Sequence, residues 1–147
     1  MSRSERTRGL VVAAVLVDHL DQPRRLLAAR RSTPADLAGR WEFPGGKVQA
    51  GEHPCDGLRR ELDEELGVEV VLGAELSGPA DGYWPISDAY EMRVWFATLS
   101  VGDPTPTGSH DELRWLTADA LGTVPWLEAD RAVEDVLSRL MVCPKTC

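Results

Sequence analysis

Three glutamates in the middle of the chain stand at a spacing that suits metal binding. Glu61, Glu64 and Glu65 occupy positions i, i+3 and i+4, so a helix of about 3.6 residues per turn would project their carboxylates from one face. Like charges this close repel each other. A divalent cation would relieve the repulsion, and Mg²⁺ or Mn²⁺ prefers carboxylate oxygens and water as ligands. Taken alone, the spacing is explained equally well by a solvated acidic helix face.

The residues beside these glutamates favour the metal-binding interpretation. An apolar stripe at helical spacing borders the acidic face, and it consists of Cys55, Leu58, Leu62 and Leu66. The carboxylates would therefore lie near the packed edge of the helix, where loss of water makes their repulsion more costly. A Pro-Gly-Gly turn at residues 44–46 precedes the helix, and its backbone groups can approach a metal or a phosphate closely.

A longer pattern around these glutamates resembles the Nudix box. It consists of Gly46, five residues, Glu52, seven residues and then Arg60-Glu61-Leu62-x-Glu64-Glu65-x-Gly67-Val68. The match spans 23 residues with nine specified positions. The preceding segment WEFPGGK at residues 41–47 is similar to the approach to that box in MutT-type members.

The resemblance implies a role for each matching residue. The catalytic, metal-binding side chains would be Glu61, Glu64 and Glu65, with the backbone carbonyl of Gly45 as a further ligand of Mg²⁺. The structural residues of the box would be Gly46, Glu52, Arg60 and Gly67, with Arg60 holding the carboxylate helix in place. Phosphates would be bound by Arg30, with Arg31 as the second choice, and by Lys47. Downstream, the acids that could complete the metal site are Asp111 and Glu112.

Base recognition is predicted at the start of the last helix. Asp130 stands where MutT-type enzymes place a polar side chain against the base, and a carboxylate there can accept from an exocyclic amino group. An acid favoured by the helix dipole is an equally good interpretation of this residue. Candidate rings for stacking on a base are Phe43, Trp84 and Trp126. Tyr83 lies 16 residues past Gly67, near an aromatic marker of dinucleoside-polyphosphate hydrolases.

The implied reaction is hydrolysis of a phosphoanhydride. Metal ions neutralise the phosphate oxygens and lower the pKa of a bound water, and a carboxylate then removes the proton of that water. The resemblance implies Mg²⁺-dependent conversion of a (deoxy)nucleoside triphosphate to the monophosphate and pyrophosphate, in nucleotide-pool sanitation. Four alternatives remain: hydrolysis of dinucleoside polyphosphates, of other nucleoside diphosphates linked to another moiety, of RNA ends, or nucleotide sensing without catalysis.

Composition narrows the choice of partner. The chain has 147 residues, the length of one domain, and 24 acidic residues against 16 basic ones give a net charge of −8. A protein that binds nucleic acid through its phosphates needs a basic face, so a small nucleotide is the expected partner. No apolar run approaches the roughly 20 residues needed to cross a bilayer. With three cysteines and no CxxC pair, we expect a cytoplasmic monomer or homodimer without a membrane partner.

The elements that position these residues follow from hydrophobic periodicity. Strands are predicted at residues 10–17 and 25–29, which would form a hairpin, and at 68–72, 90–99 and 113–116. Helices are predicted at 54–66, with Gly67 as the stop, and at 128–141. Segments 30–39 and 78–89 are predicted loops. This order gives an α/β domain at residues 9–142, and the resemblance implies an α/β/α sandwich with a mixed sheet between helices. An arm (1–8) and a tail (143–147) would flank it. No histidine has a partner for nucleophilic catalysis, but the loop of His110 is predicted to approach the metal.

Overall fold

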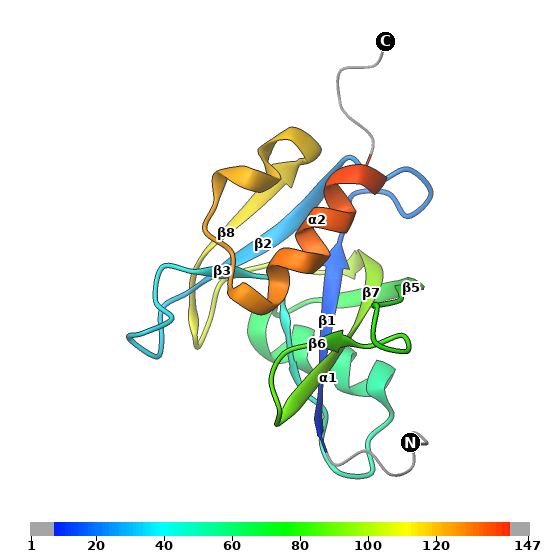
Figure 1. Cartoon of the computed structure of the whole chain (residues 1–147). Coiled ribbons are helices and arrows are strands. Elements are labelled where there is room, and N and C mark those ends of the chain that lie inside the picture. The colour runs from blue at the N-terminus through cyan, green and yellow to red at the C-terminus, as the bar shows by residue number, and fades with distance from the viewer. Residues whose placement is uncertain (1–7, 142–147) are drawn as a thin grey trace.

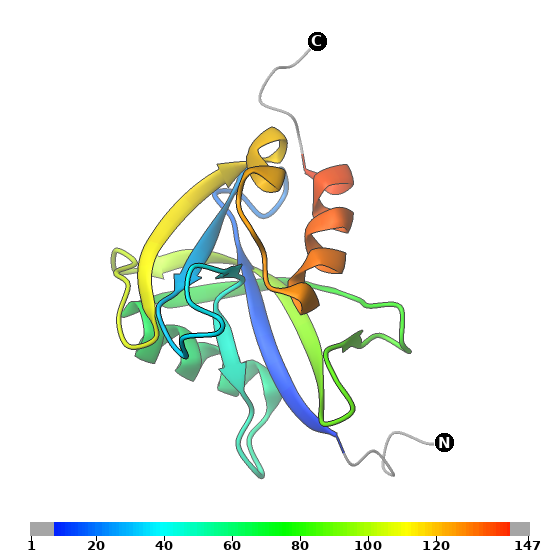
Figure 2. The same ribbon diagram turned by 60° about the vertical axis from the view of Figure 1, so that its left-hand side comes forward.

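The computed structural model describes residues 8–141, in which two helices lie on opposite sides of twisted sheets (Figures 1 and 2). The elements in chain order are β1 (Gly9–Leu16), β2 (Arg25–Arg31), β3 (Trp41–Glu42), β4 (Gly45–Lys47), α1 (Pro54–Leu66), β5 (Glu69–Leu76), β6 (Trp84–Pro85), β7 (Tyr90–Val101), β8 (His110–Thr117), the 3₁₀ turns η2 (Ala118–Thr123) and η3 (Glu128–Asp130), and α2 (Arg131–Leu140). The predicted arm, except Arg8, and the predicted tail lie outside the described residues.

The strands form two sheets. The larger has the order β4-β1-β7-β5, with β6 added beside β7, and the smaller has the order β3-β2-β8. Strands β1 and β7 run parallel, whereas the other pairs are antiparallel. The predicted mixed α/β architecture is therefore confirmed, with its strands divided between two sheets.

The predicted hairpin between the first two strands is wrong. Strand β1 pairs with β4 and β7, and β2 pairs with β3 and β8, so these neighbours in sequence belong to different sheets. A single bridge, Val17 to Leu26, joins them. The turn between them is held locally, because the Asp18 carboxylate accepts hydrogen bonds from the amides of Arg24 and Arg25. Both edges of each strand are occupied by distant segments, which local sequence patterns do not reveal.

Strand β1 separates two hydrophobic cores because successive side chains of a strand point to opposite faces. On one face Val12, Ala14 and Leu16 pack with the apolar stripe of α1. On the other face Ala13, Val15 and Val17 pack in a core that includes residues of α2, namely Val133 and Leu137. The predicted stripe of α1 is confirmed, with Leu58, Leu62 and Leu66 buried and Cys55 partly buried against them. This packing fixes which face of α1 turns toward β4.

The bounds of α1 match the prediction and are set by its two ends. Pro54 occupies the first turn, and the ring nitrogen Nδ1 of His53 accepts a hydrogen bond from the amide of Cys55. Gly67 ends the helix in the left-handed conformation, with φ of 70°, and its amide donates to the carbonyl of Asp63. The predicted second helix is divided into the turn η3 and the helix α2.

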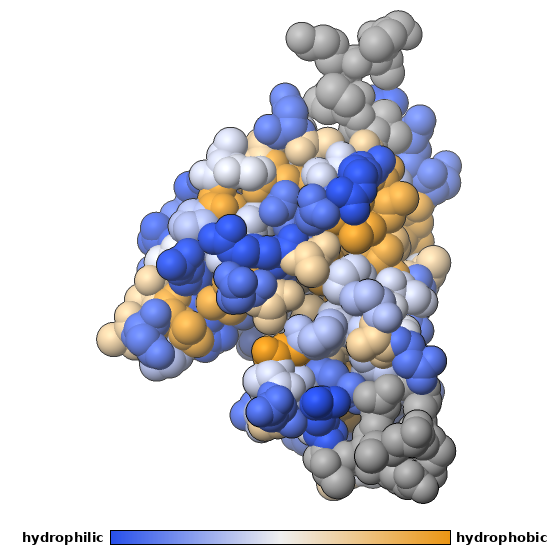
Figure 3. Space-filling view, viewed as in Figure 1, coloured by the Kyte–Doolittle hydropathy of each residue, from blue (hydrophilic) through white to orange (hydrophobic). Residues whose placement is uncertain are grey.

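The face of the molecule in view has no single dominant apolar area (Figure 3). Within residues 8–141, no helix combines the length and apolar character needed to cross a bilayer. In Figure 3, apolar residues reach this face in several separate places among hydrophilic ones.

Replacing Gly67 by alanine should destabilise the fold by about 1 kcal/mol, because the left-handed conformation strains a residue with a Cβ. A Cβ there meets no atom within 4 Å, so backbone strain is the cause. Chemical denaturation measures the change. Gly122→Ala is the matched control, since Gly122 also has open space around it but no positive φ. Equal stability of both variants would contradict the strain argument.

Candidate active site

The helix α1 brings its carboxylates against the glycines of β4. The Glu61 carboxylate lies so close to Gly46 that a Cβ on Gly46 would collide with it. The amide of Gly45 donates to Oε1 of Glu65 at 3.2 Å. The third predicted ligand, Glu64, points outward with a side chain that is 57% exposed. Two of the three glutamates therefore contact the strand that leads into the helix.

Arg60 ties this helix to the turn before it. Its guanidinium donates to both carboxylate oxygens of Glu52, at 2.8 and 3.0 Å, and to the backbone carbonyl of Lys47 at 3.1 Å. It also donates to Glu61 at 2.9 Å and to Glu64 at 3.2 Å. The hydrogen bonds from Arg60 lower the pKa of Glu52 to about 2. This geometry supports the structural roles predicted for Arg60 and Glu52.

Glu65 is the one carboxylate of the three predicted metal ligands whose pKa is clearly shifted. Its burial, with the nearby charges of Glu42 and Glu61, raises the pKa to about 7, although His110 and the Gly45 amide act in the opposite direction. A buried carboxylate beside other carboxylates is stabilised by any cation that approaches it.

The carboxylate oxygens of Glu61, Glu64 and Glu65 suit a hard divalent cation, although the three side chains do not converge on one point. Within the described part of the chain, no three acidic, histidine or cysteine side chains converge as a ready-made metal site. Glu61 and Glu64 contact Arg60, whereas Glu65 faces Gly45. All the candidate ligands offer oxygen, the donor that Mg²⁺ and Mn²⁺ prefer. Glu61, Glu64 and Glu65 would hold such an ion.

A cavity of about 230 Å³ lies beside β4 and extends to the 3₁₀ turn η3. Its lining includes Arg31, Glu42, Phe43, Lys47 and Asp130, together with Gly45 and Gly46. Residues predicted for phosphate binding and for base binding therefore meet in one cavity, next to the glycines that contact the carboxylate helix.

Asp130 is buried in this cavity wall, with only 5% of its surface exposed. Burial and the charge of Glu42 raise its pKa well above the ordinary value, and a hydrogen bond from the Phe43 backbone partly offsets them. A protonated carboxyl group offers one donor and one acceptor. That pair of groups matches the edge of a base that carries a complementary acceptor and donor.

Of the three aromatic rings predicted to stack on a base, Phe43 alone lines the cavity. Trp126 stacks on Phe43 from the core side, with ring centroids 4.6 Å apart, and its indole N–H donates to the carbonyl of Leu121. Trp84 is also buried, and its indole N–H donates to the carbonyl of Leu76. Both tryptophans are buried in the hydrophobic core, and their indole N–H groups are hydrogen-bonded inside the protein.

The structure places Arg31, not Arg30, at the cavity. Arg30 donates to Asp111 at 2.8 Å and lies 3.3 Å from Glu112, so the predicted phosphate ligand pairs with the two acids predicted to complete the metal site. Adjacent residues of a strand face opposite sides, and the pairing of β2 with β8 sets Arg30 opposite Glu112. Because 81 residues separate Arg30 from Asp111, local sequence patterns do not predict this ion pair.

Two residues that were not among the predicted site residues, Glu42 and His110, belong to the cavity region. Glu42 lines the cavity, and His110, which does not line it, reaches the Glu42 carboxylate with Nε2 at 2.6 Å. The one signal for Glu42 is its place in the WEFPGGK segment. For His110 the only signal is its loop, since 68 residues separate it from Glu42.

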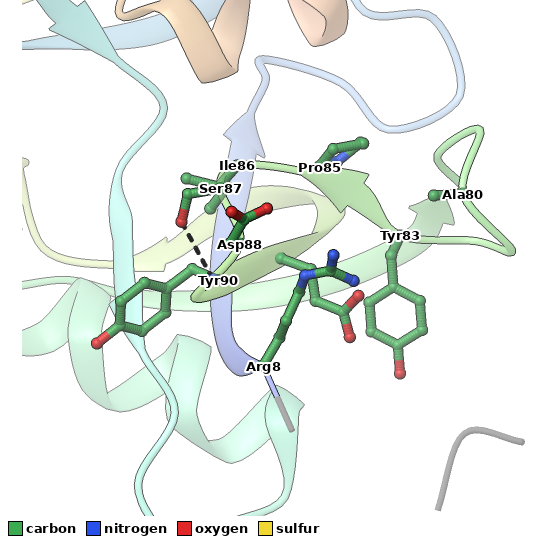
Figure 4. A pocket seen from close by; sticks show the side chains of 9 residues that line it. Arg8, Ala80, Tyr83, Pro85, Ile86, Ser87, Asp88 and Tyr90 are labelled. Atoms are coloured by element: carbon green, nitrogen blue, oxygen red, sulfur yellow. Dashed lines mark hydrogen bonds between the residues drawn. The ribbon is translucent and has the colours of Figure 1, made fainter. Parts of the chain in front are cut away.

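A second cavity of about 370 Å³ adjoins the first (Figure 4). Its lining includes Arg8, Tyr83 and Tyr90, and it shares Ile86 with the cavity beside β4. The Lys47 ammonium lies 4.8 Å from the centre of the Tyr90 ring. Tyr83, the residue behind the dinucleoside-polyphosphate alternative, therefore lies in a neighbouring cavity.

Comparison with known proteins agrees with this geometry. Residues 7–137 match the model of the NUDIX domain. A Mycobacterium tuberculosis protein, provisionally named 8-oxo-dGTP diphosphatase 2, is 42% identical over 106 residues, which cover 72% of this chain and 74% of the relative. CTP pyrophosphohydrolase of Escherichia coli is 44% identical over 63 residues, which cover 43% and 44% of the two chains. The solution structure of the E. coli ORF135 protein superposes with a TM-score of 0.73 at 25% identity, covering 95% of each chain.

Replacing Glu65 by glutamine should stabilise the metal-free protein at neutral and higher pH. The folded state raises the pKa of Glu65 from 4.5 to about 7. Between these two pH values, the folded protein therefore keeps a proton on Glu65 that the unfolded chain has released. The wild type therefore loses stability as pH rises through this range, by up to about 3 kcal/mol, and the glutamine variant does not.

Denaturation midpoints measured with a chelator across this pH range test the prediction. Glu64→Gln, at an exposed side chain, is the control and should show little such pH dependence. A Glu65→Gln variant that is never more stable than the wild type would contradict the burial of the charge.

Proposed function

Because this chain belongs to the NUDIX domain family and is a hydrolase of nucleotide pyrophosphate bonds, we propose that it cleaves (deoxy)nucleoside triphosphates. The products are the monophosphate and pyrophosphate, the reaction depends on Mg²⁺, and the role is sanitation of the nucleotide pool. One observation carries the proposal. A single cavity joins the glycine strand beside the carboxylate helix to Phe43 and Asp130.

Different residues around this cavity serve metal binding, phosphate binding and proton transfer. When bound, Mg²⁺ neutralises phosphate oxygens and lowers the pKa of coordinated water. Glu61, Glu64 and Glu65 hold the ion, and Arg60 restrains two of them. Lys47 and Arg31 supply positive charge to the phosphates at the cavity wall. A carboxylate of the metal-binding group accepts the proton of the attacking water.

The base is held at the other end of the cavity. Phe43 offers its ring for stacking, and the Trp126 ring packed against it keeps it in place. Asp130 hydrogen-bonds the edge of the base. The relatives named 8-oxo-dGTP diphosphatase and CTP pyrophosphohydrolase make 8-oxoguanine and cytosine nucleotides the first candidates. The net charge of −8 favours a free nucleotide over an RNA end.

A second candidate function is hydrolysis of a dinucleoside polyphosphate or another nucleoside diphosphate with a large substituent. The observation that favours it is the cavity with Tyr83 and Tyr90, which shares Ile86 with the nucleotide cavity. Two tyrosine rings could contact the substituent beyond the phosphates. Higher kcat/KM for such compounds than for triphosphates would select this function.

A pyrophosphate-release screen over normal, oxidised and methylated nucleotides, with Mg²⁺ and Mn²⁺, tests the proposal. Glu64→Gln and Glu65→Gln should each lower kcat by about 10–100-fold or more, because a lost metal ligand weakens both the binding and the position of the ion. Glu69→Gln, at an exposed position of β5, is the control for loss of one negative charge. Turnover within about threefold of the wild type in either active-site variant would refute the metal assignment.

Replacing Asp130 by asparagine should change the base preference rather than the chemistry. A side-chain amide has a fixed donor and a fixed acceptor, whereas a carboxyl group adapts to the base by moving its proton. The ratio of kcat/KM for cytidine and 8-oxoguanine triphosphates should shift by about tenfold, the scale of one buried hydrogen bond. An equal loss for every nucleotide would show that Asp130 does not contact the base.

A further inference from the structure

We infer that His110 is a positioning residue that fixes the Glu42 carboxylate in the wall of the nucleotide cavity, where Glu42 serves as a second polar contact for the nucleoside beside Asp130. The inference rests on the proposed function, since it concerns how the same cavity recognises its nucleotide. His110 acts through Glu42 and need not touch the ligand itself.

Glu42 is held by two donors on one of its oxygens. Oε2 accepts a hydrogen bond from Nη1 of Arg31 at 3.0 Å and lies 2.6 Å from Nε2 of His110. The Glu42 side chain keeps 14% of its surface exposed, and the residue lines the cavity with Phe43 and Asp130. Both described contacts fall on Oε2, so the carboxylate is anchored at one oxygen.

Glu42 contacts Arg31, which belongs to the proposed phosphate end, and lines the cavity together with Asp130 of the base end. Its charge raises the pKa of Glu65 in the metal-binding group and the pKa of Asp130 at the base end. The strand β3 explains this position. It pairs with β2 through Ala29 opposite Glu42, and the carbonyl of Trp41 accepts from the amide of Leu127, just before η3. A fixed carboxylate here therefore faces a ligand whose two ends are bound elsewhere.

Of the two ring nitrogens of His110, Nε2 contacts Glu42 and Nδ1 is buried without a partner among the described residues. The ring has no solvent exposure. A carboxylate accepts hydrogen bonds, so Nε2 carries the proton that points at Glu42. An unpaired buried polar atom costs about 1–3 kcal/mol, and an apolar side chain of similar size would avoid that cost. The imidazole is useful at this position for its donor to Glu42.

Arg31 alone would hold Glu42 in a different place. Its guanidinium also donates from Nε to the carbonyl of Thr33 at 2.8 Å, and its side chain is 21% exposed. Arg31 therefore draws the carboxylate toward the loop after β2, whereas His110 holds it from the buried side, at the start of β8. Loss of the His110 donor would leave Glu42 free to follow Arg31 away from the nucleoside.

The test compares two replacements of His110 that differ in the donor. His110→Gln keeps an N–H group near the position of Nε2, whereas His110→Met keeps similar volume without a donor. His19→Met, at an exposed position in the first turn, is the matched control. Calorimetry measures binding of cytidine monophosphate, 8-oxo-dGMP and inorganic pyrophosphate. Turnover of the corresponding triphosphates gives KM and kcat.

We expect His110→Met to weaken binding of at least one monophosphate and to raise KM for its triphosphate by about tenfold, the scale of a hydrogen bond to a charged group. Its kcat and its affinity for pyrophosphate should stay within about threefold of the wild type, because the phosphate end is unchanged. His110→Gln should restore monophosphate binding, and His19→Met should have no effect.

Three results would overturn the inference. Equal losses in His110→Met and His110→Gln would show a packing role, as would a loss of pyrophosphate affinity in step with nucleoside affinity. Unchanged monophosphate binding in His110→Met would show no role. If His110→Met does not fold, the test passes to Glu42→Gln, which must weaken binding of the monophosphates and leave binding of pyrophosphate unchanged.

The outcome can be told apart from failure of the proposed function, because monophosphate binding needs no turnover. A wild type that binds nucleotides without releasing pyrophosphate refutes the proposed function and leaves the comparison of His110 variants intact.

Discussion

The close approach of helix α1 to strand β4 is the constraint on which the rest of the site depends. The Glu61 carboxylate occupies the space that a side chain at residue 46 would fill, and the backbone of β1 occupies the space beside residue 45. A side chain at residue 45 would collide with the backbone of β1, and one at residue 46 would displace the Glu61 carboxylate. The same contact gives Glu65 its hydrogen bond from the strand.

The packing that enforces this approach comes from the apolar residues that border the glutamates on α1. Leu58, Leu62 and Leu66 are fully buried against the sheet, and burial of a leucine side chain contributes about 1.5–3 kcal/mol. That energy offsets the repulsion among carboxylates held close together. Arg60 removes part of the repulsion by binding Glu52 and Glu61 at once. Glu65 retains an unfavourable buried charge, which a cation or a proton relieves.

Charge is distributed so that an acidic protein can bind a polyanion. Arg31 and Lys47 line the cavity within a chain of net charge −8, while Arg30 is neutralised by the acids of β8. Glu42, which accepts a hydrogen bond from Arg31, and the buried Asp130 add two acidic groups to the same lining. A nucleotide has the matching polarity, with its charge on the phosphates and neutral hydrogen-bonding groups on the base.

The sequence by itself determined the helix with its glutamates, its Arg60 and its stop at Gly67, because a helix is built from contacts three and four residues apart. It also indicated the mixed α/β class and the family. Only the tertiary structure decided that the first two strands occupy different sheets, that Arg31 rather than Arg30 reaches the cavity, and that Trp126 supports Phe43 from behind. The tertiary structure also decided the contact of His110 with Glu42, two residues that are 68 positions apart in the sequence. These features depend on which distant strands pair and on which side each residue then faces, and a shift of one residue in the register reverses that side.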